Sequence, residues 1–188
     1  LLQGQTVHTG PQGKITLLLS NGSLLTLKPM TGMLLTALEQ KKFVLPATTQ
    51  LSELETEPST SNTKLNLGYG DLIFNVKKLN TGSAFIIDTP VGNAAIRGTS
   101  GQLSVRVDPV SKVATGALNM ATGTVEFSDK EEEVVVEVVA GEAAQAQATE
   151  EGEKVGEIQE YVAPPVIVEE VNEVVEEVER LVEELEVA

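Results

Sequence analysis

Large apolar residues occupy every second position along much of the first two thirds of the chain. The alternation is clear in residues 15–19, 25–27, 72–76 and 103–107. Such a period of two is typical of strands that bury one face. We therefore predict a mainly β body, a β-sandwich or a short β-solenoid, with strands up to about Ala143. The predicted core comprises Leu17, Leu19, Leu25, Leu27, Leu72, Phe74, Phe85, Ile87, Ile96, Leu103 and Val105.

Turn residues separate the predicted strands. Asn21-Gly22 lies between two alternating runs and predicts a hairpin in which both residues take positive φ. Gly68-Tyr69-Gly70 is interpreted as a turn, because no helix pattern follows it. Residues 34–42 fit a short helical turn or an irregular strand. Residues 46–63, which contain Ser, Thr, Glu and Pro without periodicity, are expected to form a long surface excursion.

The pattern changes near the C-terminus. We predict a body over residues 1–145, a linker rich in Ala, Gln and Glu over 146–165 that ends in Pro-Pro, and an acidic amphipathic helix over 166–188. The helix carries apolar residues at alternating spacings of four and three, a seam of the coiled-coil type. This predicted assembly seam comprises Val171, Val175, Val178, Val182 and Leu185.

Charge is divided between these parts. The formal charge is −15, yet residues 1–128 hold 8 acids and 10 bases, whereas residues 129–188 hold 20 acids and 3 bases. An acidic chain with 3% aromatic residues lacks the cationic, stacking surface that nucleic acids require. No apolar run approaches the roughly 20 residues of a membrane helix, so we expect no membrane insertion. The acidic helix is instead expected to flank a contact surface.

Candidate catalytic and metal-binding residues are scarce. Cysteine is absent, which excludes disulfides and thiolate chemistry, and His8 is the only histidine. Asp71, Asp88 and Asp108 stand apart in the sequence. We therefore predict no catalytic, metal or cofactor site, and no enzyme. An enzyme acting on polysaccharide stays open as a further hypothesis, and it would need two carboxylates roughly 5–10 Å apart.

One segment resembles the signature of the FecR domain family. It runs from Phe85 through Thr89-Pro90 and continues VGNAAIRGT to Thr99. Further similarities follow in the family's order and bring the resemblance to about residues 4–145. They are an opening Gly-x-x-Val-x-Thr at 4–9, a hairpin at 17–29, a Gly-x-Leu-x-x-x-Val strand at 70–76 and a closing Gly-Glu strand at 139–142.

The signature residues allow a structural interpretation. Pro90 fixes φ and ends a strand, and glycines permit close backbone turns. Arg97 has two possible roles: its five donors could join loops inside the domain, which we favour, or bind an anionic ligand. The predicted structural signature comprises Thr89, Pro90, Gly92, Arg97, Gly98 and Thr99.

The resemblance implies an extracytoplasmic, non-catalytic all-β module. In the family's best-known arrangement this domain lies in the periplasm, beyond a membrane helix and a cytoplasmic anti-sigma segment, and relays a receptor's signal. Neither of those parts is recognisable here. Because the sequence also starts at Leu1, it fits an exported, free-standing member whose signal peptide has been removed, or a shortened chain. The expected location is extracellular or periplasmic.

Two functional hypotheses follow. The first is a structural protein that forms a homo-oligomer or an extracellular filament, in which the acidic helix contacts another copy. The alternative is a FecR-type periplasmic sensing module in a signalling relay, with a membrane receptor as partner, or a ligand-binding module.

Overall fold

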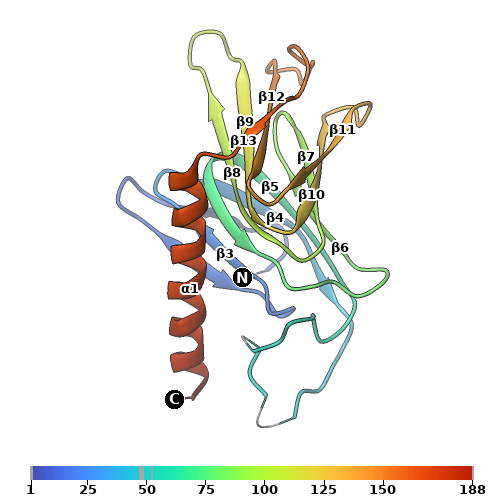
Figure 1. Ribbon diagram of the computed structural model, residues 1–188, viewed down its shortest axis with the longest axis vertical. Coiled ribbons are helices and arrows are strands. Elements are labelled where there is room, and N and C mark those ends of the chain that lie inside the picture. Colours follow the sequence, from blue (N-terminus) through green and yellow to red (C-terminus); the bar gives the residue numbers. More distant parts are fainter. Residues whose placement is uncertain (1, 47–48, 52, 188) are drawn as a thin grey trace.

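The described residues form thirteen strands and one helix, and the helix lies against the outside of the strands (Figure 1). The computed structural model describes residues 2–46, 49–51 and 53–187. The strands in the first half are β1 (Thr6–His8), β2 (Ile15–Leu18), β3 (Leu24–Leu27), β4 (Gly32–Gln40), β5 (Ser61–Asn75), β6 (Ala84–Asp88) and β7 (Gly92–Ile96). The remaining elements are β8 (Ser100–Val107), β9 (Ala114–Thr122), β10 (Thr124–Asp129), β11 (Val135–Val139), β12 (Glu142–Ala148), β13 (Gln159–Val162) and α1 (Pro165–Val187).

Two sheets share the long strand β5. Sheet A has the order β1-β4-β5-β6-β7-β10-β11, and sheet B has the order β2-β3-β5-β8-β9-β12-β13. The N-terminal half of β5 pairs in sheet A and its C-terminal half pairs in sheet B. Only the β5–β6 pair is parallel among the described strand pairs. This arrangement is a sandwich rather than a solenoid, and the predicted mainly β fold with a C-terminal helix is confirmed.

The core lies between the two sheets, as the alternation predicts. Phe74, Phe85 and Phe127 are its largest fully buried side chains. Among the predicted core residues, Leu17 and Leu19 are only partly buried and pack against the core, because β2 lies at the edge of sheet B. The other nine are buried: Leu25, Leu27, Leu72, Phe74, Phe85, Ile87, Ile96, Leu103 and Val105.

The hairpin between β2 and β3 is present, but its turn differs from the prediction. Gly22 has φ of 83°, whereas Asn21 is not among the residues with positive φ. The Asn21 side chain instead accepts a hydrogen bond from the backbone amide of Ser23 (3.0 Å). The Leu19 amide donates to the Ser23 carbonyl, so the loop is longer than a two-residue turn. A single left-handed glycine closes such a longer loop.

Two of the ambiguous segments form strands. Residues 34–42 fall mostly within β4, whose pairing with β5 shifts register between Leu35 and Ala37. The predicted linker 146–165 contributes its first three residues to β12 and residues 159–162 to β13. Small alanine side chains let β12 pack inside the sandwich, and Ala144 is fully buried. The body therefore continues past residue 145, up to the start of α1.

The expected surface excursion at 46–63 contains one buried anchor. Residues 47, 48 and 52 lie outside the described residues. Glu57 is 3% exposed, and its carboxylate accepts hydrogen bonds from the Ser61 and Ser83 hydroxyls and from the Asn80 amide. The last residues of the segment already belong to β5. This network fixes residues 55–61 against the loop that precedes β6.

Helix α1 begins one residue before the predicted start. Pro165 opens the helix, where its missing N–H costs nothing. Val171, Val178 and Val182 are buried, and Val174 packs beside Leu24 together with Val178 and Val182. Leu185, by contrast, is 76% exposed, since the last turns of α1 extend beyond β3 (Figure 1). Among the described residues, no helix has the length and apolar character needed to span a membrane.

Candidate functional site

A glycine allows β5 to cross from one sheet to the other. Tyr69 is the last β5 residue that pairs with β4, and Gly70 is the first that pairs with β8. Gly70 has φ of +96°, and a Cβ there would lie only 2.4 Å from the Thr31 Cα. The predicted turn at 68–70 is therefore wrong: these residues lie inside β5, at its bend. The two glycines do mark a bend in the chain, but this bend lies within the continuous strand β5.

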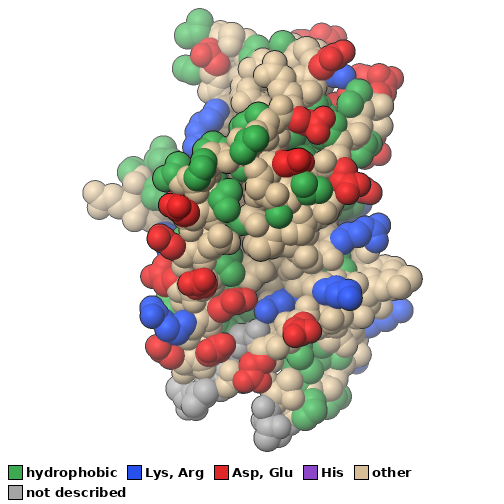
Figure 2. Space-filling view, in the orientation of Figure 1, with side chains coloured by type: hydrophobic (Ala, Val, Ile, Leu, Met, Phe, Trp, Pro, Cys, Tyr) green, Lys and Arg blue, Asp and Glu red, His purple; other side chains and the backbone are tan. Residues whose placement is uncertain are grey.

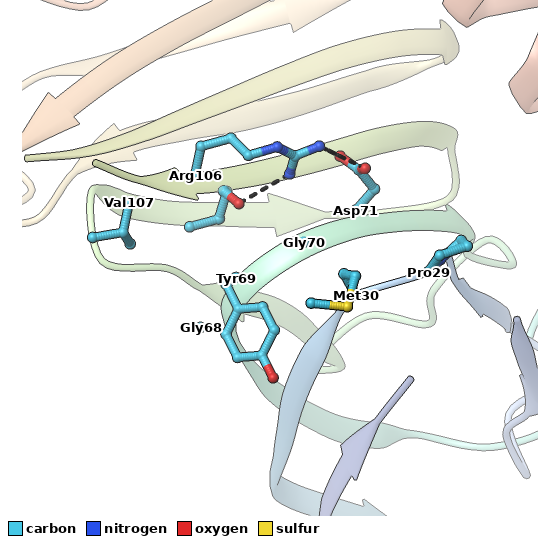
Figure 3. A pocket seen from close by; sticks show the side chains of 9 residues that line it. Pro29, Met30, Gly68, Tyr69, Gly70, Asp71, Arg106 and Val107 are labelled. Atoms are coloured by element: carbon cyan, nitrogen blue, oxygen red, sulfur yellow. Dashed lines mark hydrogen bonds and ion pairs between the residues drawn. The ribbon is translucent and has the colours of Figure 1, made fainter. Parts of the chain in front are cut away.

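The bend borders a hollow of about 460 Å³ at one end of the sandwich. Its walls come from β5, β8 and the loop between β3 and β4 (Figure 3). The lining residues are Pro29, Met30, Gly68, Tyr69, Gly70, Asp71, Val105, Arg106 and Val107. Three of them expose large apolar surfaces: Met30 is 57% exposed, Tyr69 43% and Val107 48%.

An ion pair holds the polar side of this hollow. Arg106 Nη2 donates to both carboxylate oxygens of Asp71, at 2.8 and 2.7 Å, and Arg106 Nη1 donates to the Val105 carbonyl at 3.0 Å. Partial burial alone would raise the pKa of Asp71, but hydrogen bonds from Arg106 and Ser104 and the nearby positive charges outweigh it and lower this pKa. Asp71 therefore stays ionised and fixes the guanidinium at the rim, where the Arg106 side chain is 61% exposed.

The aromatic side of the hollow is fixed by histidine. The Tyr69 hydroxyl and His8 Nδ1 share a hydrogen bond of 3.1 Å, and the two rings stack with centroids 6.2 Å apart. Tyr69 is thus held in one orientation while much of its surface stays exposed. Met, Tyr and Arg are enriched at protein interfaces, and Tyr and Arg are common among the residues that contribute most binding energy. Their gathering around one hollow makes this end of the sandwich a candidate surface for binding a protein.

The sequence alone did not bring these residues together. Asp71 was expected to stand apart, and nothing in its neighbourhood indicates Arg106. The register supplies the link: Asp71 pairs with Ser104, so Arg106 is its diagonal neighbour on the same face of β8. Outward-facing opposite charges on two strands are a usable signal only once their pairing is known.

The predicted signature residues lie at the two ends of β7, and none of them lines this hollow. Thr89 is fully buried; its hydroxyl donates to the Gly92 carbonyl and accepts from the amides of Val91 and Gly92, which closes the turn at Pro90. A Cβ on Gly92 would overlap the Ser128 carbonyl oxygen at 1.9 Å. These residues therefore serve close backbone packing between β7 and β10.

The second half of the signature connects β7 to β8. Gly98 has φ of +120°, and a Cβ there would lie 2.8 Å from the Lys78 Cα. Thr99 is buried, and its carbonyl accepts the Val76 amide. Arg97 is exposed, and the described part of the chain shows no hydrogen bond or ion pair from its side chain. The favoured interpretation of Arg97 as an internal joint between loops thus finds no contact to support it.

The predicted assembly seam lies against its own chain. Val171, Val178 and Val182 are buried on sheet B, Val175 is partly buried, and Leu185 is exposed. The five residues therefore do not form one continuous free seam. As for metal chemistry, no group of three or more His, Asp or Glu side chains in the described ranges is arranged to hold an ion.

Known proteins share this architecture. Two crystal structures of a "putative anti-sigma factor" from Parabacteroides distasonis ATCC 8503, at 2.50 and 1.65 Å resolution, share the fold. Each has a TM-score of 0.55 and 17% sequence identity, and the match covers 85% of this chain but only 60% of the Parabacteroides chain. No curated protein matches. The model of the family described as FecR protein matches residues 5–126, more than half of the sequence. The chain therefore belongs to the FecR family.

Proposed function

We propose that this chain is a FecR-type signalling module of the cell envelope that acts by binding a protein partner and performs no catalysis. The observation that carries the proposal is the exposed cluster of Met30, Tyr69, Arg106 and Val107 around the hollow, on a fold of the FecR family. A rigid aromatic ring and a fixed guanidinium lose little conformational entropy when a partner binds. The partner under this proposal is a membrane receptor, and the output is a change in transcription.

Two further observations support the relay. The fold is shared with a protein described as a "putative anti-sigma factor". An extracytoplasmic location accords with the family. The filament hypothesis is less well supported, because the helix that was expected to contact another copy packs on its own sheet B.

The proposal is tested by complementing a strain from which the gene has been deleted. Val107→Glu places a carboxylate at the rim of the hollow without removing any hydrogen bond. Val44→Glu is the matched control, since Val44 is 95% exposed and follows the opposite end of β4. We expect a defined set of transcripts to change on deletion, to be restored by the wild-type and Val44→Glu chains, and to stay altered with Val107→Glu.

Transcript levels that are the same with and without the gene would contradict the signalling role. Full restoration by Val107→Glu would contradict the choice of surface while leaving the signalling role intact. Circular dichroism of both purified variants checks that neither substitution unfolds the sandwich.

A further inference from the structure

Helix α1 covers a face of sheet B that is only partly apolar. The helix contacts β5, β8 and β9, and its valines pack around Leu24. Gln102 and Asn119, a cross-strand pair, point to this face because Leu103 and Leu118 point to the core. We call this face the helix seat.

The centre of the helix seat contains unsatisfied polar groups. Gln102 is 5% exposed and Asn119 3%, yet no described residue gives the side-chain carbonyl oxygen of either a hydrogen-bond partner. Buried polar groups of this kind are costly, whereas water would satisfy them if the helix moved away. Permanent core surfaces rarely contain such a pair. The helix seat therefore has the composition of a surface that is sometimes exposed.

Three ion pairs border the helix seat. They join lysines of the body to glutamates of α1: Lys14 to Glu177 at 3.2 Å, Lys28 to Glu170 at 2.5 Å, and Lys77 to Glu179 at 3.5 Å. The glutamates are 35–50% exposed, so salt screens these pairs. Figure 2 shows acidic side chains following α1 along this side of the molecule. These pairs therefore favour an acidic helix over a basic one, but they contribute little to the stability of its docking.

Helix α1 is poorly stabilised by its own sequence. Its first turn has no acidic residue and its last turn no basic residue, so neither end is favoured by the helix dipole. Glu183 and Glu184 place negative charge near the unfavourable end. Valine, the main apolar residue of α1, is also a mediocre helix former. Docking on the helix seat thus supplies much of the helix's stability.

We propose that the helix seat is a docking surface for an acidic amphipathic helix of a partner protein, and that α1 is its displaceable internal occupant. Charge complementarity identifies the occupant: Lys14, Lys28 and Lys77 surround an apolar centre at Leu24, and α1 displays the shape and charge that fit. The helix seat shares no lining residue with the hollow near Tyr69, so peptide binding and the transcript assay test the two proposals separately.

The test uses a fluorescein-labelled peptide of residues 164–188 and the full-length chain. A released variant reverses the three paired glutamates: Glu170→Lys, Glu177→Lys and Glu179→Lys. Its matched control reverses three exposed glutamates outside these pairs and carries the same net charge: Glu173→Lys, Glu176→Lys and Glu184→Lys. We expect fluorescence anisotropy to show that the released variant binds the peptide at least about tenfold more tightly than the control, because it lacks an intramolecular competitor.

Two additional arms test the surface. Adding Lys28→Ala to the released variant should weaken binding several-fold, and raising the salt from about 50 to about 500 mM should weaken it further. Equal binding by the released and control variants, or none by either, overturns the proposal. A wild-type chain that forms a dimer by exchanging α1 overturns it as well, because the helix seat would then serve a second copy.

A measurement on the intact helix guards against misfolding of the released variant. The chain has no cysteine, so Leu185→Cys and Val110→Cys, both at exposed positions, accept spin labels selectively. Electron–electron double resonance should give one narrow distance that broadens as unlabelled peptide is added. A distance distribution that excess peptide leaves unchanged contradicts displacement.

Discussion

Replacing Gly70 with alanine tests the crossing of β5 between the two sheets. A non-glycine residue at positive φ costs about 1–2 kcal/mol, and the smaller set of unfolded conformations offsets about 0.4–1 kcal/mol of that. The new Cβ would also lie 2.3 Å from Thr31 Oγ1 and 2.4 Å from the Thr31 Cα, and relieving such crowding costs roughly 1–3 kcal/mol more. We expect Gly70→Ala to lower the free energy of unfolding by about 2–4 kcal/mol.

Gly82 provides the matched control. It has φ of +88°, close to that of Gly70, but no atom of the described residues lies within 4 Å of the position its Cβ would take. Gly82→Ala should therefore cost only about 0.5–1 kcal/mol, the conformational part alone. Urea unfolding followed by circular dichroism measures both values. Equal losses for the two variants would refute the close approach of β5 to Thr31.

Three other substitutions have predicted effects on the free energy of unfolding. Asp71→Asn should cost at most about 1 kcal/mol at pH 7, because Arg106 is largely exposed. Folding lowers the pKa of Asp71 from 3.8, so the stability that its carboxylate contributes is fully present above pH 3.8. This stability is lost as the pH falls through the lower pKa of the folded chain. Urea unfolding should therefore separate Asp71→Asn from the wild-type chain at pH 7 and give more similar stabilities near pH 3. Glu57→Gln should cost about 1–3 kcal/mol in urea unfolding, since the amide NH₂ meets donors such as the Ser83 hydroxyl; an unchanged midpoint would contradict the buried network. Arg97→Ala should change stability by less than about 0.5 kcal/mol, and a larger loss would show a structural contact.

Local alternation was sufficient to predict much of the core. Leu25, Leu27, Leu72 and Phe74 all point into the core. The residues next to each of them in sequence point to the opposite face of the strand. The period of two is a property of the strand itself, so it can be seen in a single segment. The same holds for the spacings of seven and four residues that place Val171, Val178 and Val182 on one face of α1.

The features that the sequence did not reveal depend on strand pairing. Lys14, Lys28 and Lys77 are distant in sequence, and they surround the helix seat only because β2, β3 and β5 lie side by side. The seam of α1 predicted a contact but could not say whether its partner is the same chain or another. A periodic pattern predicts which side of a helix is buried. The surface against which that side packs depends on long-range topology.

The molar mass of the purified chain distinguishes partner binding from filament formation most directly. Static light scattering during gel filtration should give a mass near 19.9 kDa at micromolar concentration, because α1 is docked on its own sheet B. A larger, concentration-dependent mass that returns to the monomer when Lys28→Glu weakens the helix seat would contradict the account and favour assembly through α1.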